Sequence, residues 1–427
     1  MIKISQYFKQ EFGVCGEILD FCAAVESELF TRFEEIDRIA EYNQLKVLSA
    51  MQKNRLGDAH FAATTGYGYN DLGRDTLERI YADVFLTDAA LVRHQIISGT
   101  HALTVALFGN LRYEDELLSP VGKPYDTLEG VIGVRKTRGS LIEHGIKYRQ
   151  VDLTRDGGID YKALRSAVNQ KTRLVTIQRS KGYSWRRSFA VAEITELIDF
   201  IKSLNPEVIC MVDNCYGEFV ETAEPSEADL IVGSLIKNPG GGLAPVGGYI
   251  AGKEEYVDNA AARMTSPGLG REVGPTLGIT PSLTQGLFLA PQTVSAGLKG
   301  AVFAAAIFEK LGFDVLPGSL DKRADIVQAI ALNTPENVLA FCRGIQESSP
   351  VDSFATPEPS VMPGYDAKVI MAAGAFVQGS SIELSADAPM KPPYAVFLQG
   401  GLTWHHAKAG VIMAVDRMYR RGLLGGL

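Results

Sequence analysis

Between residues 90 and 255, short apolar runs alternate with amphipathic segments, and this alternation constrains the fold more than any other feature of the chain. Continuous runs of Val, Ile and Leu of this length are typical of strands that are buried on both faces. The helical pattern of Val191–Leu204 lies between two such runs and would complete a β–α–β unit. The runs are His94–Ile97, Val131–Val134, Leu174–Ile177, Val208–Val212, Leu230–Val232 and Tyr249–Ala251. We therefore predict a mostly parallel sheet with right-handed crossovers.

The segments on either side of this alternation predict helices, loops and a second, smaller α+β region. Apolar residues at near-helical spacing predict helices over residues 16–55, 76–85, 293–311 and 407–418. Stretches rich in Gly, Thr, Asn or Pro predict loops over residues 60–74 and 262–292. Short apolar runs such as IVQAIAL and SIELSAD alternate with helical patterns after residue 310. We predict an N-terminal helical segment (1–60), a large domain (61–305) and a smaller C-terminal α+β domain (306–427).

The composition of the 427 residues is that of an ordinary globular protein, with 46% hydrophobic and 22% charged residues. The net charge of −8 argues against nucleic acid as the main partner, because phosphate binding needs a basic face. The five cysteines show neither a disulfide framework nor zinc-ligand spacing. No signal-peptide pattern and no apolar run of about 18 residues is present, so we expect a cytoplasmic enzyme without a membrane span. No metal is expected, because the adjacent His405 and His406 cannot share one helical face.

A loop suited to binding phosphate follows the first predicted strand. The sequence Ser98-Gly99-Thr100-His101 precedes an apolar helical stretch, LTVALFGNL. Gly99 permits a sharp turn, and the free N–H groups and dipole of the first helical turn favour an anion. An ordinary strand–helix loop with a Ser or Thr cap would look the same, so this signal alone is ambiguous.

An aspartate, Asp213, ends the predicted strand Val208–Val212. A carboxylate at the end of a buried strand is costly unless it faces a cationic partner. The protonated pyridine nitrogen of pyridoxal 5′-phosphate (PLP) would be such a partner, and the charged ring withdraws electrons from the α-carbon of a substrate. An N-cap for the following segment is the competing interpretation.

A lysine, Lys237, follows the predicted strand Leu230–Val232 and precedes a glycine-rich stretch. Apolar surroundings lower the pKa of a lysine, and a neutral amine is the nucleophile that a carbonyl cofactor needs. Ser234 lies three residues earlier, within reach of a phosphate. A surface lysine on a loop is the alternative for Lys237. In parallel sheets ligands bind at the carboxyl ends of the strands, so the three segments together predict PLP as a Schiff base on Lys237.

These motifs resemble those of fold-type I PLP-dependent enzymes, and more narrowly the cystathionine/methionine lyase group of Cys/Met metabolism. Val212-Asp213-Asn214-Cys215-Tyr216 is similar to the VDN(T)Y segment of that group, and Ser234-x-x-Lys237 is similar to its S-x-T-K. The blocks GYGYNDLGRDTLE, QRSKGYSW and LQGGLTWHHAKAG resemble the branch called aluminium resistance protein or methionine gamma-lyase family protein. The resemblance implies an α/β fold: a large domain with a mostly parallel seven-stranded sheet and a smaller C-terminal α+β domain.

The resemblance also implies roles for particular residues. Gly99 and Thr100 would give backbone N–H groups to the cofactor phosphate, and Ser234 would add its hydroxyl. Tyr125 would stack on the cofactor ring, although it could instead be only a turn residue. His101 is the alternative stacking residue. Tyr67 or Tyr69 would reach the phosphate site of a neighbouring subunit, which implies a homodimer or homotetramer with shared sites. Simple loop packing remains the other interpretation of both tyrosines.

The chain also departs from the group in two places. Ile236 replaces the second phosphate-binding hydroxyl, and Glu383 lies at or near the position of the arginine that binds the substrate carboxylate. A carboxylate there would repel the substrate, so another residue would have to bind it, or the substrate is not a plain α-amino acid. The candidates are Arg179, Lys181, Arg186 and Lys391, of which Arg179 and Lys181 are best placed because they follow a predicted strand end. Each of the four could instead form a structural salt bridge.

The predicted function is that of a carbon–sulfur lyase acting on a sulfur-containing amino acid, by elimination of the cystathionine beta-lyase or methionine gamma-lyase type. Lys237 would act as the base that removes the α-proton, and Asp213 would keep the ring protonated. An aminotransferase or racemase would have the same cofactor site. A PLP-binding stress or metal-resistance protein with weak catalysis is a third possibility. A Schiff-base enzyme without PLP would leave the phosphate loop and Asp213 without a purpose.

Overall fold

The computed structural model describes residues 4–362, 365 and 367–425. The chain divides into two compact units. The central unit consists of residues 42–180 and 188–290, and the terminal unit of residues 1–41, 181–187 and 291–427. The first 41 residues thus share a unit with the C-terminal part of the chain, whereas the predicted domains, bounded at residues 60 and 305, remain a prediction. Parts of these predicted domains, residues 1–3, 363, 364, 366, 426 and 427, lie outside the described residues.

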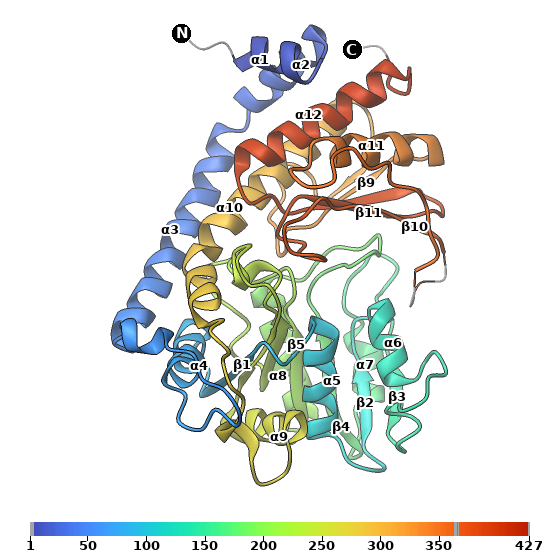
Figure 1. Ribbon diagram of the computed structural model, residues 1–427. Helices are drawn as coiled ribbons and strands as arrows, with labels where there is room; N and C mark the ends of the chain where they lie inside the picture. The colour runs from blue at the N-terminus through green and yellow to red at the C-terminus, as the bar shows by residue number, and fades with distance from the viewer. Residues whose placement is uncertain (1–3, 363–364, 366, 426–427) are drawn as a thin grey trace. The chain divides into compact units, whose positions relative to one another are not determined.

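The central unit contains a seven-stranded sheet of order β1-β7-β6-β5-β4-β2-β3 (Figure 1). Its strands are β1 (Ala89–Arg93), β2 (Glu116–Ser119), β3 (Lys147–Gln150), β4 (Thr172–Gln178), β5 (Ile209–Asp213), β6 (Leu230–Ser234) and β7 (Gly248–Gly252). Strands β2 to β6 run parallel to one another, and β7 is antiparallel to both β6 and β1. The mostly parallel seven-stranded sheet is therefore confirmed.

Helices connect these strands and bury the apolar faces of the sheet. They are α4 (Leu72–Phe85), α5 (Gly99–Asn110), α6 (Asp126–Ile132), α7 (Tyr161–Ala167), α8 (Val191–Leu204) and α9 (Glu254–Met264), with short 3-10 turns η1 (Asp58–Phe61), η2 (Asn238–Gly240) and η3 (Gly270–Glu272). Helices α5 and α9 pack against each other beside β6, β7 and β1. The core between them is formed by buried side chains such as Leu91, Ala106, Leu174 and Ile250. This packing fixes the strand ends that carry the predicted motifs.

Several element predictions in the central unit are wrong. The first strand ends at Arg93, and the predicted run His94–Ile97 is a turn in which the N–H of Ile96 donates to the Arg93 carbonyl. The run Val131–Val134 is the end of α6, which stops at Gly133 in the left-handed region (φ 98°). Short apolar runs look alike in strands and buried helices, so periodicity could not separate them. Strand β3 was missed because it is a polar edge strand.

The terminal unit contains a five-stranded antiparallel sheet of order β10-β11-β12-β9-β8. Its strands are β8 (Val315–Leu316), β9 (Gln328–Ala331), β10 (Val369–Ala372), β11 (Ser385–Pro389) and β12 (Ala395–Gln399). Its helices are α1 (Ile4–Glu11), α2 (Gly16–Ser27), α11 (Pro335–Glu347) and α12 (Trp404–Arg420), together with parts of α3 (Phe30–Lys53) and α10 (Thr280–Lys310). Helix α11 packs on the sheet and against α12 (Figure 1). This confirms the smaller α+β architecture.

The predicted loop over residues 262–292 is only partly a loop. Helix α9 continues to Met264, and α10 already begins at Thr280, with Pro281 in its first turn and Pro291 in its interior. Proline fits the first turn of a helix because no N–H bond is lost there. Likewise α4 begins at Leu72 rather than Thr76, since Asp71 caps it by accepting from the N–H of Arg74. None of the helices in the described residues is long and apolar enough to span a membrane.

Candidate active site

Lys237 lies directly after β6, where the chain enters the turn η2. Pro239 occupies this turn, and buried glycines around it allow close backbone packing, since a Cβ on Gly240 would come within 1.7 Å of the Leu235 carbonyl oxygen. The Nζ of Lys237 lies 3.7 Å from the centroid of the Tyr216 ring. The lysine is therefore directed at the segment that follows the neighbouring strand β5, as expected for a ligand site at the carboxyl ends of parallel strands.

The acidic neighbours of Lys237 determine its charge. Burial alone would lower the pKa of Lys237, but Tyr216, Cys215 and Asp213 raise it above the ordinary value. The sequence predicts a lowered pKa for Lys237, and this prediction is wrong for the protein without a cofactor. The error arises because the apolar neighbours along the chain are visible in the sequence, whereas the acidic groups come from a different strand end.

Asp213 ends β5 between β4 and β6, in register with Gln178 and Val232. Its carboxylate is nearly fully buried and accepts a hydrogen bond from the backbone N–H of Cys215 at 3.2 Å. Burial raises the pKa of Asp213, while hydrogen bonds from the thiol and N–H of Cys215, and the charge of Lys237, oppose that rise. Asp213 thus lies beside Lys237, and among the described residues its carboxylate accepts from one backbone N–H and one weak thiol donor.

The phosphate loop lies beside Ser234 and Cys215. Ser98 caps α5 by accepting from the N–H of His101 at 3.1 Å, and the dipole of α5 favours an anion at this end of the helix. A Cβ added to Gly99 would lie 3.2 Å from the Ser234 Cβ and 3.3 Å from the Cys215 Sγ. The Ser234 Oγ is buried and has no hydrogen-bond partner among the described residues. A buried hydroxyl without a partner, next to the N-terminus of a helix, fits an anionic ligand such as a phosphate.

The N-terminus of α5 is also joined to the segment that contains Tyr125. The hydroxyl groups of Thr100 and Thr127 form a hydrogen bond of 2.8 Å. Tyr125 precedes α6 as its N-cap residue and is partly exposed, two residues before Thr127. His101 accepts a hydrogen bond at its Nδ1 from the N–H of Ile97 at 3.2 Å. The structure thus brings Tyr125 and His101 near the phosphate loop, and their stacking roles stay predictions.

Arg179 follows β4 and is fully buried. Its guanidinium donates to the Asn214 Oδ1 at 2.7 Å and to the Glu221 carboxylate at 2.7 Å, and lies 3.6 Å from Glu224. Its backbone N–H donates to the Asp213 carbonyl. These contacts favour the structural alternative for Arg179, since the fully buried guanidinium binds the segment that follows Asp213 and does not face an open space.

The other predicted carboxylate-binding residues belong to the terminal unit or its surface. The buried Lys181 pairs with Asp325 at 3.3 Å, and burial lowers its pKa. Burial also lowers the pKa of Arg186, to about 10. Lys391 is exposed. The carboxylate of Glu383 accepts the backbone N–H groups of Phe376 and Val377 at 2.8 and 2.9 Å, so its charge is already satisfied inside the terminal unit.

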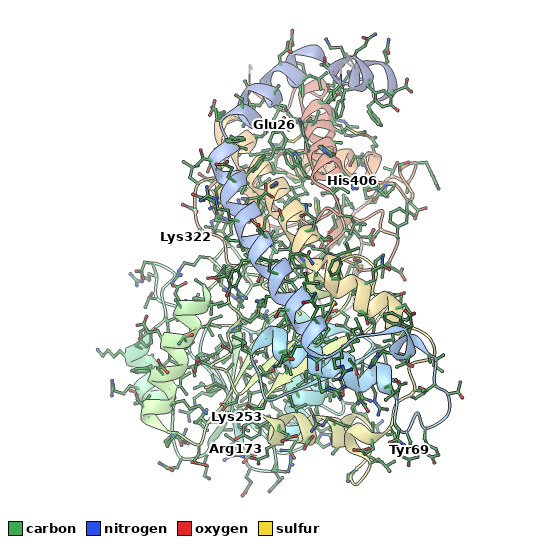
Figure 2. All side chains as sticks on the ribbon, turned by 90° about the vertical axis from the view of Figure 1, so that its left-hand side faces the viewer. Glu26, Tyr69, Arg173, Lys253, Lys322 and His406 are labelled. Carbon is green, nitrogen blue, oxygen red and sulfur yellow. The ribbon has the colours of Figure 1, made fainter. Side chains whose placement is uncertain are left out.

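Tyr67 and Tyr69 lie on the loop that precedes α4, and their rings stack with centroids 5.4 Å apart. Both are more than half exposed, and Figure 2 shows Tyr69 at the surface. The loop itself is tightly held: Arg74 donates to the Gly68 carbonyl at 2.7 Å, and the N–H of Gly274 donates to the Tyr67 carbonyl at 2.8 Å. A rigid loop that exposes two aromatic rings is suited to contact another protein surface.

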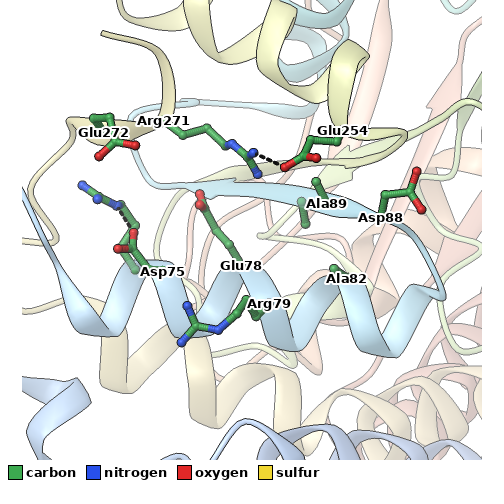
Figure 3. Close-up of a pocket in the computed structure, with 11 residues that line it drawn as sticks. Asp75, Glu78, Arg79, Ala82, Asp88, Ala89, Glu254, Arg271 and Glu272 are labelled. Atoms are coloured by element: carbon green, nitrogen blue, oxygen red, sulfur yellow. Dashed lines mark hydrogen bonds and ion pairs between the residues drawn. The ribbon is translucent and has the colours of Figure 1, made fainter.

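A separate polar pocket of about 350 Å³ lies between α4, β1 and α9 (Figure 3). None of its lining residues belongs to the predicted site. Its arginines are largely neutralised: Arg271 pairs with Glu254 at 2.9 Å, and Arg74 with Asp75 at 2.8 Å. No group of His, Cys, Asp and Glu side chains in the described part of the chain could hold a metal ion.

Sequence reasoning missed three residues that the fold places around Lys237 and Asp213. Tyr216 contacts the lysine, and the Cys215 thiol lies between Asp213 and the phosphate loop. Glu218 is fully buried and accepts from the Tyr249 hydroxyl at 2.8 Å, and burial raises its pKa to about 8. Cys215 and Tyr216 belong to the VDNCY segment, so their proximity to Asp213 was a visible signal.

The sheet order and the placement of these groups at the ends of β5 and β6 define a PLP-dependent fold-type I enzyme. At low identity the same fold occurs in CalE6, a methionine gamma lyase from Micromonospora echinospora, with a TM-score of 0.53 and 18% identity over 83% of this chain and 93% of that one. The model of the methionine gamma-lyase family matches residues 18–419. The chain therefore belongs to the methionine gamma-lyase family.

Relatives of known structure or sequence cover nearly the whole chain. The YnbB protein of Bacillus subtilis (strain 168) is 53% identical over 414 residues, which is 96% of this chain and 98% of that protein. A carbon–sulfur lyase involved in aluminium resistance from Clostridium novyi NT is 47% identical, with a TM-score of 0.94, over 98% of this chain and all of that one. A candidate cystathionine beta-lyase involved in aluminium resistance from Clostridium acetobutylicum is 49% identical, with the same coverage and TM-score.

Family membership makes the chain a carbon–sulfur lyase that depends on PLP, which confirms the prediction from the motif order. The site fits this cofactor on two observations. The Ser234 hydroxyl, which has no partner among the described residues, and the N-terminus of α5 suit its phosphate, and the buried Asp213 suits its ring nitrogen.

Proposed function

We propose that this enzyme cleaves the carbon–sulfur bond of a sulfur-containing amino acid by elimination, of the cystathionine beta-lyase or methionine gamma-lyase type. The balanced reaction consumes the amino acid and one water, and releases a thiol, a 2-oxo acid and ammonia. The observation that carries the proposal is the arrangement of Lys237, Asp213 and Ser234 at adjacent strand ends, where the Asp213 side chain and the Ser234 Oγ are buried. The names of the two Clostridium relatives point to the same class of reaction.

Each residue has a separate task in this proposal. Gly99, Thr100 and Ser234 bind the phosphate of PLP through N–H groups and a hydroxyl. PLP would supply the electron withdrawal that makes the α-carbon of the substrate amino acid acidic, once the substrate amine has taken the place of Lys237 on the cofactor. Asp213 holds a proton on the ring nitrogen, and Lys237, once its amine is free, takes the proton from the α-carbon. Tyr125 or His101 covers one face of the ring.

The state of Glu383 supports an ordinary α-amino acid as substrate. Its two backbone N–H partners offset the negative charge, so the repulsion of a substrate carboxylate that its sequence position suggests is weakened. Arg186 and Lys391 remain candidates for binding that carboxylate. Because Arg179 and Lys181 already pair with carboxylates of the chain, they are the weaker candidates.

The proposal includes an even-numbered homo-oligomer in which Tyr67 or Tyr69 reaches the phosphate site of a second subunit. The stacked, exposed rings on a rigidly held loop support this role. A homotetramer in the cytoplasm is the form we expect, and the five free cysteines agree with a reducing compartment.

A panel of amino acids tests the proposed reaction. The purified enzyme with PLP is incubated with L-cystathionine, L-methionine, L-cysteine and L-alanine, and thiol, 2-oxo acid and ammonia are measured separately. Equal amounts of all three from a sulfur amino acid support elimination. A 2-oxo acid formed only with an amino acceptor, without ammonia, would instead identify an aminotransferase, and inversion of L-alanine would identify a racemase.

A further inference from the structure

Tyr216 is the residue in direct contact with the predicted catalytic lysine. The Nζ of Lys237 lies 3.7 Å from the centroid of its ring, and the side chains of the two residues also form a hydrogen bond. An ammonium group at this distance from an aromatic face is attracted by the ring quadrupole, and the phenolic oxygen can accept one of its protons. The tyrosine therefore binds the amine through both its ring and its hydroxyl.

The backbone of Tyr216 adopts a conformation that bulky residues rarely use. Its φ of 73° lies in the left-handed region, which is costly for a residue with a large side chain. Such a conformation persists only where the surroundings determine it, so the neighbouring contacts must hold Tyr216 in place. This conformation directs the tyrosine side chain at Lys237 rather than away from it.

Contacts on both sides of Tyr216 hold this turn. The N–H of Asn214 donates to the Val232 carbonyl at 2.9 Å, and the N–H of Gly217 donates to the Asn214 carbonyl at 2.8 Å. A Cβ on Gly217 would come within 2.5 Å of the Arg179 guanidinium, so only glycine fits against this arginine. Arg179 in turn donates to the Asn214 side chain. The turn is thus locked to β6 on one side and to Arg179 on the other.

We propose that Tyr216 is a positioning residue, which holds the Nζ of Lys237 between its ring and its hydroxyl so that the amine faces the cofactor site. The inference rests on the proposed function, since it takes Lys237 as the residue that carries PLP. The same turn begins with Asp213 and ends with Tyr216, so one rigid segment places both the ring-nitrogen partner and the lysine. Asp213, Cys215 and Tyr216 are the ionisable groups that act most strongly on the amine.

The test uses two variants of Tyr216 and one matched control. Tyr216→Phe keeps the ring and removes the hydroxyl, while Tyr216→Leu removes both contacts. Tyr148→Phe removes the hydroxyl of another partly exposed tyrosine, which bonds Gln150 on β3. Circular dichroism and thermal unfolding show whether each variant folds. If Tyr216→Leu does not fold, Tyr216→Phe alone is sufficient for the test.

The first measurement needs neither a substrate nor turnover. Cofactor-free protein is acetylated with acetic anhydride across a pH series, and modification of Lys237 is followed by peptide mass spectrometry. Because Tyr216 raises the pKa of Lys237, its loss should lower that pKa, and each unit gives about tenfold more neutral amine at a fixed pH. We expect faster labelling in Tyr216→Phe, and an unchanged rate in Tyr148→Phe. Wild-type labelling of Tyr216→Phe at every pH would overturn the proposal.

The second measurement separates positioning from a merely structural role. Although Tyr216→Phe has more neutral amine, we expect it to capture PLP about tenfold more slowly, measured by the growth of visible absorption, because the amine no longer faces the site. We also expect the variant to lower kcat while KM stays within about twofold. Capture at the wild-type rate would contradict the proposal even if labelling changed. Since labelling and PLP capture are independent of substrate, failure of the amino-acid panel would refute the proposed reaction and leave this inference intact.

Discussion

Replacing Arg179 by Gln would separate its structural role from binding of a substrate carboxylate. The guanidinium is fully buried and serves Asn214, Glu221 and Glu224 at 2.7, 2.7 and 3.6 Å. Removing one partner of a buried ion pair costs about 3–5 kcal/mol, because the remaining charges stay buried and uncompensated. Glu221 is 29% exposed at its side chain, so solvent screens part of this cost and the lower end of the range is expected.

Thermal unfolding measures this loss. In a unit of this size each kcal/mol lowers Tm by about 2–4 °C, so Arg179→Gln should unfold on the order of 10 °C earlier than the wild type. Arg173→Gln is the matched control, on the strand β4 that Arg179 follows. Arg173 donates only a 3.4 Å bond to the Glu207 carbonyl and is labelled at the surface in Figure 2. Its replacement should leave Tm nearly unchanged.

Kinetics give the contrasting result for a substrate-binding arginine. If Arg179 bound the substrate carboxylate, Arg179→Gln would keep the wild-type Tm and raise KM strongly. An unchanged Tm would therefore refute the structural role that the contacts with Asn214 and the two glutamates indicate.

Three further predictions concern the cofactor and the buried carboxyl. Lys237→Ala should abolish both the visible absorption of bound PLP and turnover, and retention of either would remove Lys237 from its proposed role. Ser234→Ala should weaken PLP binding by about tenfold in a fluorescence titration, since it removes one charge-assisted hydrogen bond. Replacement of the exposed Ser203 by Ala is the control and should leave PLP binding unchanged. Equal dissociation constants for Ser234→Ala and the wild type would exclude Ser234 from the phosphate site. Burial raises the pKa of Glu218 to about 8, above its ordinary value of 4.5, so the folded protein binds the extra proton and stability falls as pH rises from about 4.5 to 8. Glu218→Gln cannot ionise and should flatten this pH dependence in urea unfolding, and an identical slope in the variant would disprove it.

The local sequence determined the elements that carry a strong and unbroken pattern. The helix Val191–Leu204 has the bounds that its apolar spacing predicts, and β4, β5 and β6 overlap the continuous apolar runs. Strands with weaker patterns were not predicted correctly. Strand β3, with the sequence KYRQ, pairs on one side only and needs no apolar face. The run His94–Ile97 is apolar only in part and forms a turn after β1, in which the N–H of Ile96 donates to the Arg93 carbonyl.

The sequence by itself determined the site's chemical components: a lysine, a strand-ending aspartate and a serine beside an open helix N-terminus, in the order of a PLP enzyme. Parallel strands bring their carboxyl ends to one edge, so order along the chain was enough to predict that these groups meet. Only the tertiary structure decided their charge states and supports. The pKa of Lys237 is raised rather than lowered, because Tyr216, Cys215 and Asp213 approach it from the end of β5. Arg179 is committed to Asn214 and Glu221 for the same reason, since interactions between distant segments depend on distances that only the folded chain sets.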